Sequence, residues 1–118
     1  MNIEKPVFMQ IIEMIENKII EGTYKFDNII ISTTEISKLL SVNPSTAVKA
    51  VSILTNQGVL YKKRGIGMCV TEKAFEIITS RRKQQLFNEA IPLLIGEAKT
   101  LGIDKEEIIG FIEKKYVK

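Results

Sequence analysis

Three consecutive cations, Lys62, Lys63 and Arg64, form the group in this sequence whose residue types and spacing most directly suggest chemistry. They precede Gly65-Ile66-Gly67, and the run 59–71 as a whole is typical of a short β-hairpin with this basic segment at its tip. Glycines let the tip turn tightly and approach a partner, and the cations gather positive charge where phosphates would lie. By themselves, three cations at a turn are more often solvated than bound. The elements before the hairpin decide between the two readings.

A second candidate group lies on a helix predicted over residues 44–57. Asn43 is a favourable N-cap, Pro44 is favoured at the first helical position, and Gly58 follows the helix. One face of this helix is apolar: Ala47, Ala50, Val51 and Leu54. The other face is short-chained and mostly polar: Ser45, Val48, Lys49, Ser52 and Asn56. The second face could therefore enter a DNA major groove.

The roles on that face follow from helix geometry. Ser45 and Thr46 add hydroxyls beside the free N–H groups of the helix start, where a phosphate or a base-edge acceptor is favoured. Lys49 could reach a guanine edge or a phosphate, and Val48 could contact a thymine methyl. We assign Asn43 and Ser52 to the same DNA-binding set.

A shorter helix is predicted just before this one. The run Ser32-Thr33-Thr34-Glu35 has the form of a capping box, which predicts a helix that ends near Ser41. Its side chains Ile36, Leu39 and Leu40 should face inward. Since two residues separate the helices, the pair predicts a helix-turn-helix. Ser32, Thr33 and Thr34 would then contact the DNA backbone.

The remaining elements complete a fold class. A first helix is predicted from about Pro6 to Glu21, with a core stripe at helical spacing: Phe8, Ile11, Met14, Ile15 and Ile19. A short apolar segment follows over 29–31. A helix, a helix-turn-helix and a basic hairpin in this order predict a winged helix-turn-helix DNA-binding domain over residues 1–71, so the protein is mainly α, with an α+β character.

Residues 72–118 are predicted to form a helical dimerisation tail. Thr71 should cap a helix that starts at Glu72, Pro92 should kink or divide it, and Asp104 with Glu107 should cap a last helix. A small winged domain cannot cover every apolar face of this tail, so a second copy should. The dimerisation set is Phe75, Ile78, Leu86, Phe87, Ile91, Leu94, Ile95, Ile108 and Ile112. A two-fold dimer would bind double-stranded DNA at an inverted-repeat operator.

Composition argues against other classes of protein. The chain has 118 residues, no histidine and one cysteine, so zinc sites, catalytic triads and an intramolecular disulfide are not expected. We expect no metal, no cofactor, no enzymatic activity and no membrane span, and we expect a soluble cytoplasmic protein. A net charge of +3 permits a polyanionic partner. The tail is too small to enclose a metabolite, and no polar cluster identifies an effector site.

Two further groups have alternative readings. Cys69 is expected to fill a small space in the core, and a redox role is the alternative. The run Arg81-Arg82-Lys83 is expected to form a solvated helix face, and contact with phosphates flanking the operator is the alternative.

These motifs resemble the DNA-binding domain of GntR-type bacterial regulators, and residues 6–70 are most similar to the short YtrA-type branch. The motifs that carry the resemblance are Pro6-Val7-Phe8-x-Gln10-Ile11, Val42-Asn43-Pro44-Ser45-Thr46 with Lys49-Ala50, and Lys63-Arg64-Gly65-Ile66-Gly67-Met68. The resemblance implies a homodimer formed by the tail. It also implies a repressor of its own operon and of neighbouring genes, often for an ABC transporter.

The sequence departs from the family pattern at several places. Phe26-Asp27-Asn28 replaces a frequent Pro-Gly-Asp, and Thr34 and Pro44 stand where many members have DNA-contacting arginines. Those arginine contacts do not carry over. The competing hypothesis is a winged-helix module that binds protein without reading DNA sequence. Such a module would not distinguish an inverted repeat from random duplex.

Overall fold

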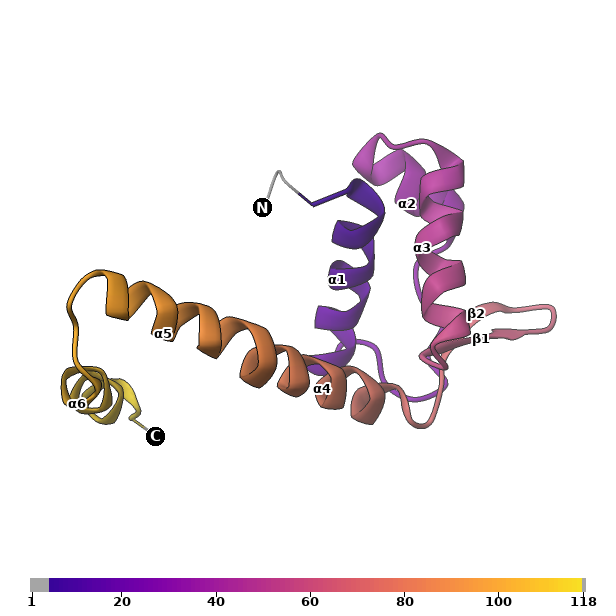
Figure 1. Ribbon diagram of the computed structural model, residues 1–118. Coiled ribbons are helices and arrows are strands. Elements are labelled where there is room, and N and C mark those ends of the chain that lie inside the picture. The colour runs from indigo at the N-terminus through magenta and orange to yellow at the C-terminus, as the bar shows by residue number, and fades with distance from the viewer. Residues whose placement is uncertain (1–4, 118) are drawn as a thin grey trace. The chain divides into compact units, whose positions relative to one another are not determined.

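The computed structural model describes residues 5–117 (Figure 1). The chain divides into two compact units, one that ends at Ser80 and one that starts at Arg81, and each is described by itself. The predicted fold class, mainly helical with a small antiparallel hairpin, is confirmed. The elements are α1 (Val7–Ile20), α2 (Thr33–Leu40), α3 (Pro44–Asn56), β1 (Leu60–Lys63), β2 (Gly67–Val70), α4 (Ala74–Gln85), the π-helical η1 (Leu86–Ala90), α5 (Ile91–Thr100) and α6 (Lys105–Lys115).

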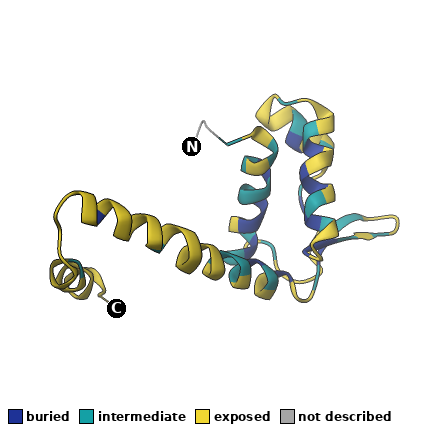
Figure 2. Ribbon diagram, viewed as in Figure 1, coloured by how far each residue is buried: buried dark blue, intermediate teal, exposed yellow. Residues whose placement is uncertain are grey.

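The core of the first unit forms where α1 packs against α3. Ile11, Ile15 and Ile19 recur every four residues on α1 and are buried, as the sequence predicted. On α3 the buried face starts with Ala47 and Ala50, and small side chains let two helices approach closely. Figure 2 shows the buried residues concentrated along α1, α3 and the base of the hairpin. This packing turns the opposite face of α3 to the outside.

Helix α2 is capped as predicted, but its inward face differs from the prediction. Ser32 Oγ accepts the Glu35 N–H at 3.1 Å, and Ile36 is fully buried. Leu39 is 68% exposed and Leu40 is also exposed, so placing these two inward was wrong. The buried face is rotated toward Ser37, whose hydroxyl donates to the Val42 carbonyl at 2.6 Å. The chain then leaves the helix at Ser41 in a left-handed conformation.

The segment 27–30 pairs with strand β2 of the hairpin in the manner of a short third strand. Asp27 N–H donates to the Val70 carbonyl at 2.8 Å, and Ile30 N–H donates to the Met68 carbonyl at 2.9 Å. Ile29 forms a bridge with Cys69, which is buried as predicted. Strand β2 therefore lies between segment 27–30 and β1. This arrangement ties the base of the hairpin to the loop after α1.

Helix α4 starts later than the sequence predicted, at Ala74. The Thr71 hydroxyl donates to the Gly58 carbonyl at 2.5 Å instead of capping a helix at Glu72, so that prediction was wrong. The hydroxyl thereby joins the two ends of the hairpin. Ala74 and Ile78 of α4 are buried in the core of the first unit.

The second unit consists of helices with little buried surface of their own. The π-helical segment η1 ends where Ile91 N–H donates to the Leu86 carbonyl, just before Pro92. Proline has no N–H and its ring clashes with the carbonyl four residues earlier, so a widened turn at this point accommodates it. Asp104 caps α6 by accepting the Glu107 N–H at 2.9 Å, as predicted. Among residues 81–117, Ala98 is the only buried apolar residue.

Candidate nucleic-acid interface

The outer face of α3 carries the predicted DNA-reading side chains together. Ser45, Val48, Lys49 and Ser52 are all exposed, and Val48 is 50% exposed although it is apolar. Thr46 is half-buried. The residues lie on one face because α3 buries the opposite stripe against α1 and α2. This face can present hydroxyls, one ammonium and one methyl-bearing side chain to a groove.

The start of α3 is held by its cap. Asn43 Oδ1 accepts from both the Ser45 N–H and the Ser45 hydroxyl, each at 3.0 Å. Two of the predicted DNA-binding side chains thus bond to one another. Asn43 orders the first turn, and the positive end of the α3 dipole remains exposed to solvent beside Pro44 and Ser45.

The second predicted contact region, the start of α2, is held in a similar way. The Ser32 hydroxyl accepts the Glu35 N–H and also lies 3.1 Å from a Glu35 carboxylate oxygen. Thr34 is exposed and Thr33 is half-buried. Ser32 is therefore a cap, and Thr34 is the most accessible hydroxyl of this group.

Lys49 has an aromatic partner within the chain that was not predicted from the sequence. Its Nζ lies 3.9 Å from the centroid of the Phe8 ring, on the first turn of α1. An aromatic face attracts a cation, so the ring restrains the ammonium group. Phe8 was predicted to be a core residue, and its ring is also packed partly against the core.

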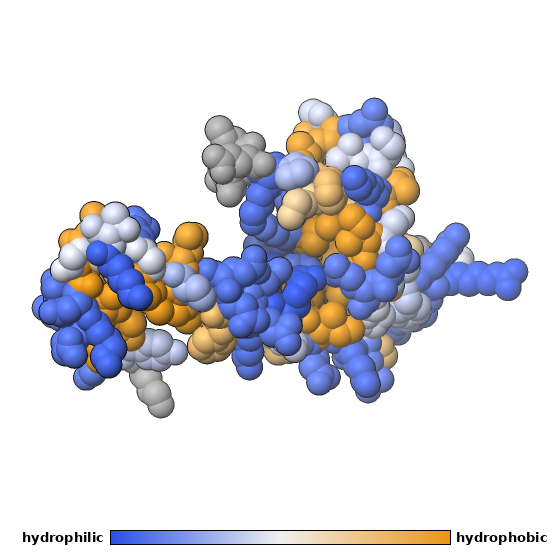
Figure 3. Space-filling model, viewed as in Figure 1, coloured by the Kyte–Doolittle hydropathy of each residue, from blue (hydrophilic) through white to orange (hydrophobic). Residues whose placement is uncertain are grey.

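The hairpin presents the predicted basic tip. Strands β1 and β2 pair in the register Leu60↔Val70 to Lys63↔Gly67, which leaves Arg64, Gly65 and Ile66 as the turn. Lys62, Arg64, Gly65 and Ile66 are exposed, and Figure 3 shows strongly hydrophilic side chains projecting from this tip. Gly65 has a φ of +77°, which favours glycine.

Gly67 serves the hairpin's own packing. Its φ is +140°, and a Cβ there would lie 3.2 Å from Ile29 Cδ1. From the sequence, this glycine was predicted to allow close approach of an external partner. The structure shows that it allows close approach of the neighbouring segment 27–30.

Lys63 is paired within the chain. Its Nζ lies 2.8 Å from Asp27 Oδ2, and the Tyr61 hydroxyl donates to Asp27 Oδ1. The hydrogen bond from Lys63, followed by that from Tyr61, lowers the pKa of Asp27, and the bond to Asp27 raises the pKa of both Lys63 and Tyr61. Asp27 was not identified from the sequence because its partners are 34 and 36 residues away.

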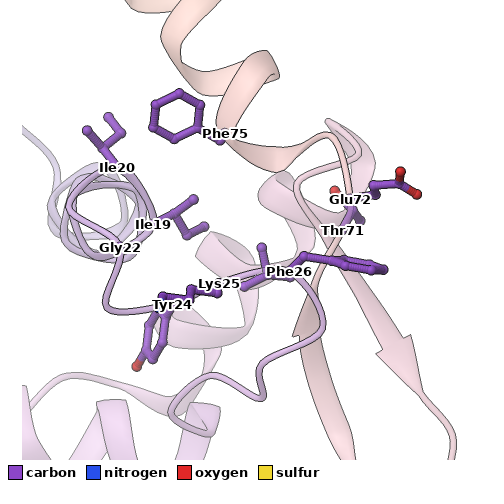
Figure 4. Close-up of a pocket in the computed structure, with 10 residues that line it drawn as sticks. Ile19, Ile20, Gly22, Tyr24, Lys25, Phe26, Thr71, Glu72 and Phe75 are labelled. Carbon is purple, nitrogen blue, oxygen red and sulfur yellow. The ribbon is translucent and has the colours of Figure 1, made fainter.

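The first unit also contains an open hollow of about 290 Å³ (Figure 4). It lies between the end of α1, the loop after it, the end of β2 and the start of α4. The Phe75 ring, predicted to mediate dimerisation, lines this hollow near Ile20. The lining is mostly apolar, and none of the predicted DNA-binding residues takes part in it.

The predicted dimerisation residues fall into three groups by burial. Ile78 is fully buried in the core of its own unit, because α4 packs its first turns there, and we remove it from the proposed interface. Ile91 and Ile108 are half-buried. The others are exposed: Phe75, Leu86, Phe87, Leu94, Ile95 and Ile112. Figure 3 shows apolar surface open on α5 and α6.

Within residues 5–117, no three or more metal-binding side chains of the His, Cys, Asp or Glu type come together. None of the helices in that range is both long enough and apolar enough to cross a bilayer.

Similar proteins provide independent information. No family model matches the chain. It is 29% identical over 105 residues to the uncharacterised HTH-type transcriptional regulator YhcF of Bacillus subtilis, covering 89% of this chain and 85% of YhcF. It is 26% identical over 109 residues to the HTH-type transcriptional repressor YtrA of the same organism, covering 92% of this chain and 83% of YtrA.

Solved structures also match, two of them over nearly the whole chain. A GntR family transcriptional regulator from Listeria monocytogenes has a TM-score of 0.75 and 31% identity, with 100% of both chains covered. A protein described as a GntR-family regulator from Bacteroides thetaiotaomicron has a TM-score of 0.78 and 33% identity, with 91% of this chain and 94% of that chain covered. The DNA-binding domain of AraR, solved in complex with operator ORR3, matches 56% of this chain and 80% of its own with a TM-score of 0.53 and 32% identity.

Proposed function

Because the chain belongs to the GntR family of transcriptional regulators, and to its YtrA-type branch, we propose that it is a repressor that binds an inverted-repeat operator as a homodimer. Members of this family are transcription factors and not enzymes. The observation that carries the proposal is the exposed polar face of α3 beside a basic hairpin in one compact unit. The related fold of AraR occurs in complex with an operator.

In the proposed complex, α3 lies in the major groove and its side chains contact base edges. Lys49 and Val48 would read bases, and Ser45 and Ser52 would contact bases or phosphates. The start of α2 would face the DNA backbone through Thr34. The hairpin would contact backbone phosphates or the minor groove through its exposed cations.

The homodimer is proposed from the exposed apolar side chains of the second unit. Phe87 is 65% exposed, Leu93 is 75% exposed and Phe111 is also exposed. Surface of this kind costs free energy in water, and a second copy offers a matching surface by symmetry. The proposed targets are the protein's own operon and a neighbouring operon for an ABC transporter, which places its action in the cytoplasm, where the chromosome lies.

The test is binding to the promoter fragment upstream of the protein's own gene. Fluorescence anisotropy would compare a fragment that carries an inverted repeat with a random duplex of equal length, over about 50 to 200 mM salt. A repressor should prefer the inverted repeat by roughly a thousand-fold or more, with a steep salt slope. Equal binding to both duplexes would reject sequence-specific regulation and favour an interaction module.

A further inference from the structure

The Asp27 carboxylate joins two segments that are far apart in sequence. It accepts hydrogen bonds from Tyr61 and Lys63, two alternate residues of β1, while its own N–H pairs with Val70 of β2. Asp27 has a φ of +68°, a left-handed conformation that aspartate tolerates better than most residues. The carboxylate therefore reaches over the central strand to the outer one.

Small residues on the central strand make this reach possible. Cys69 lies directly opposite Tyr61 and Gly67 lies directly opposite Lys63, so these four positions share one face of the sheet. Ile29, two residues after Asp27, bridges to Cys69 and approaches Gly67 on that same face. A larger side chain at Cys69 or Gly67 would occupy the path between Asp27 and β1. The small residues opposite Tyr61 and Lys63 therefore leave room for this carboxylate.

The ion pair between Asp27 and Lys63 distinguishes Lys63 from the other two cations of the hairpin. The Lys63 ammonium is engaged by Asp27, whereas Lys62 and Arg64 are exposed. Lys62 pairs with Met68 across the strands and points to the opposite face from Tyr61 and Lys63. A phosphate that contacted Lys63 would share its ammonium group with the Asp27 carboxylate and would meet the negative charge of that carboxylate.

We propose that Asp27 is a specificity-determining residue of this regulator: it keeps Lys63 from phosphate and fixes the hairpin, so that Lys62 and Arg64 make the ionic contacts with DNA. The inference rests on the proposed function. In this proposal the Asp27 carboxylate neutralises the charge of Lys63, which reduces binding to DNA of any sequence. The same contact keeps the hairpin in one position for the operator.

The first experiment measures salt slopes on the operator and on random duplex. Lys63→Met should leave the slope at the wild-type value, whereas Lys62→Met should lower it by about one for each protomer bound. Asp27→Asn keeps the side-chain shape and suits a left-handed residue. It should raise affinity for random duplex by about three- to ten-fold and reduce the ratio of operator to random binding.

The matched control is Glu72→Gln, which removes one negative charge from an exposed position close to the end of β2. This variant should leave both slope and ratio unchanged. Equal slope losses for Lys63→Met and Lys62→Met would overturn the inference. So would an Asp27→Asn variant with the wild-type ratio.

A second experiment needs no DNA. The alkaline titration of tyrosine in the free protein, followed by ultraviolet absorbance and assigned with Tyr61→Phe, should show Tyr61 titrating at lower pH in Asp27→Asn. An unchanged Tyr61 titration would overturn the inference. A wild-type chain that binds operator and random duplex equally would instead overturn the proposed function, so the two failures are distinguishable.

Discussion

Asp27, Tyr61 and Lys63 show how three side chains can connect a hairpin to a segment that is distant in sequence. Both hydrogen bonds to Asp27 are charge-assisted, but solvent reaches all three side chains. These contacts therefore contribute little to the free energy of unfolding. Their value is geometric, because they restrict how β1 can move relative to segment 27–30. Cys69, buried between these segments, gives the hairpin a packed interior without a bulky side chain.

The pairing makes a first prediction about pH. Since the pKa of Asp27 is below its ordinary value of 3.8 in the folded chain, its contribution to stability is present above about pH 4 and is lost as the pH falls through the lowered pKa. The raised pKa values of Tyr61 and Lys63 act at the other end: their contributions are present below about pH 10 and are lost as the pH rises through the raised values.

Urea unfolding of the wild type and of Asp27→Asn, measured from neutral to acidic pH, tests this directly. The two proteins should differ at neutral pH and converge in acid. A difference that stays constant through the acidic range would show that the carboxylate charge is not involved.

A second residue-scale prediction concerns the reading cation on α3 and a phosphate-contacting cation on the hairpin. Lys49→Ala should weaken operator binding by about 1–3 kcal/mol and relax sequence preference, because it removes a base-edge contact. Arg64→Ala should weaken binding to all sequences and reduce the salt slope by about one per protomer. If Arg64→Ala leaves affinity and slope unchanged, the hairpin does not contact DNA.

At the scale of elements, the start of α3 depends on its cap. The Asn43 side chain accepts a hydrogen bond from the Ser45 N–H. Pro44 has no backbone N–H and therefore leaves no donor unpaired at the first helical position. We predict that Asn43→Ala lowers the free energy of unfolding by about 1 kcal/mol. Asn43→Ser should restore most of it, and Asn56→Ala, at the exposed end of the same helix, serves as the control. A loss as large in Asn56→Ala as in Asn43→Ala would argue against the cap.

Helices α1 and α3 are also linked on their solvent side by Phe8 and Lys49. A lysine held over a ring loses less side-chain freedom when it contacts DNA. We predict that Phe8→Leu weakens operator binding by about 0.5–1 kcal/mol. The effect should vanish in a Lys49→Met background. An equal loss in both backgrounds would mean that Phe8 acts through packing alone.

At the scale of the whole molecule, the two units differ in how they treat apolar residues. The first unit buries its isoleucines and alanines in one core, while the second unit leaves phenylalanine, leucine and isoleucine exposed along η1, α5 and α6 (Figure 2). A monomer with this surface would be prone to association. In the proposed dimer this surface would join two copies of the chain. The dimer would then present two copies of α3, one for each half of an inverted repeat.

We predict that Phe87→Asp dissociates the dimer and weakens operator binding with it, because a carboxylate would be buried in the apolar contact. Sedimentation equilibrium gives the mass, and Gln84→Asp places the same charge at a polar, exposed position of α4 as the control. A Phe87→Asp protein that remains dimeric would move the interface elsewhere.

Much of this fold could be predicted because its signals are local. The caps Ser32, Asn43 and Asp104 act on N–H groups two or three residues away, and the stripe on α1 repeats every turn, so neighbouring residues contain the whole signal. The exposed face of α3 and the hairpin with its basic tip follow from the same kind of pattern.

Local sequence patterns therefore predicted the set of elements and, for α1 and α3, the face that meets the core. Tertiary packing decides which side chains are buried, so Ile78 lies in the core of its own unit and Leu39 lies at the surface. It also decides the contacts between distant residues, namely Thr71 with Gly58 and Lys63 with Asp27. The physical reason is the range of the interactions. A cap or a helical stripe depends on residues within one turn, whereas an ion pair across three strands forms after the chain has brought residues 36 positions apart together.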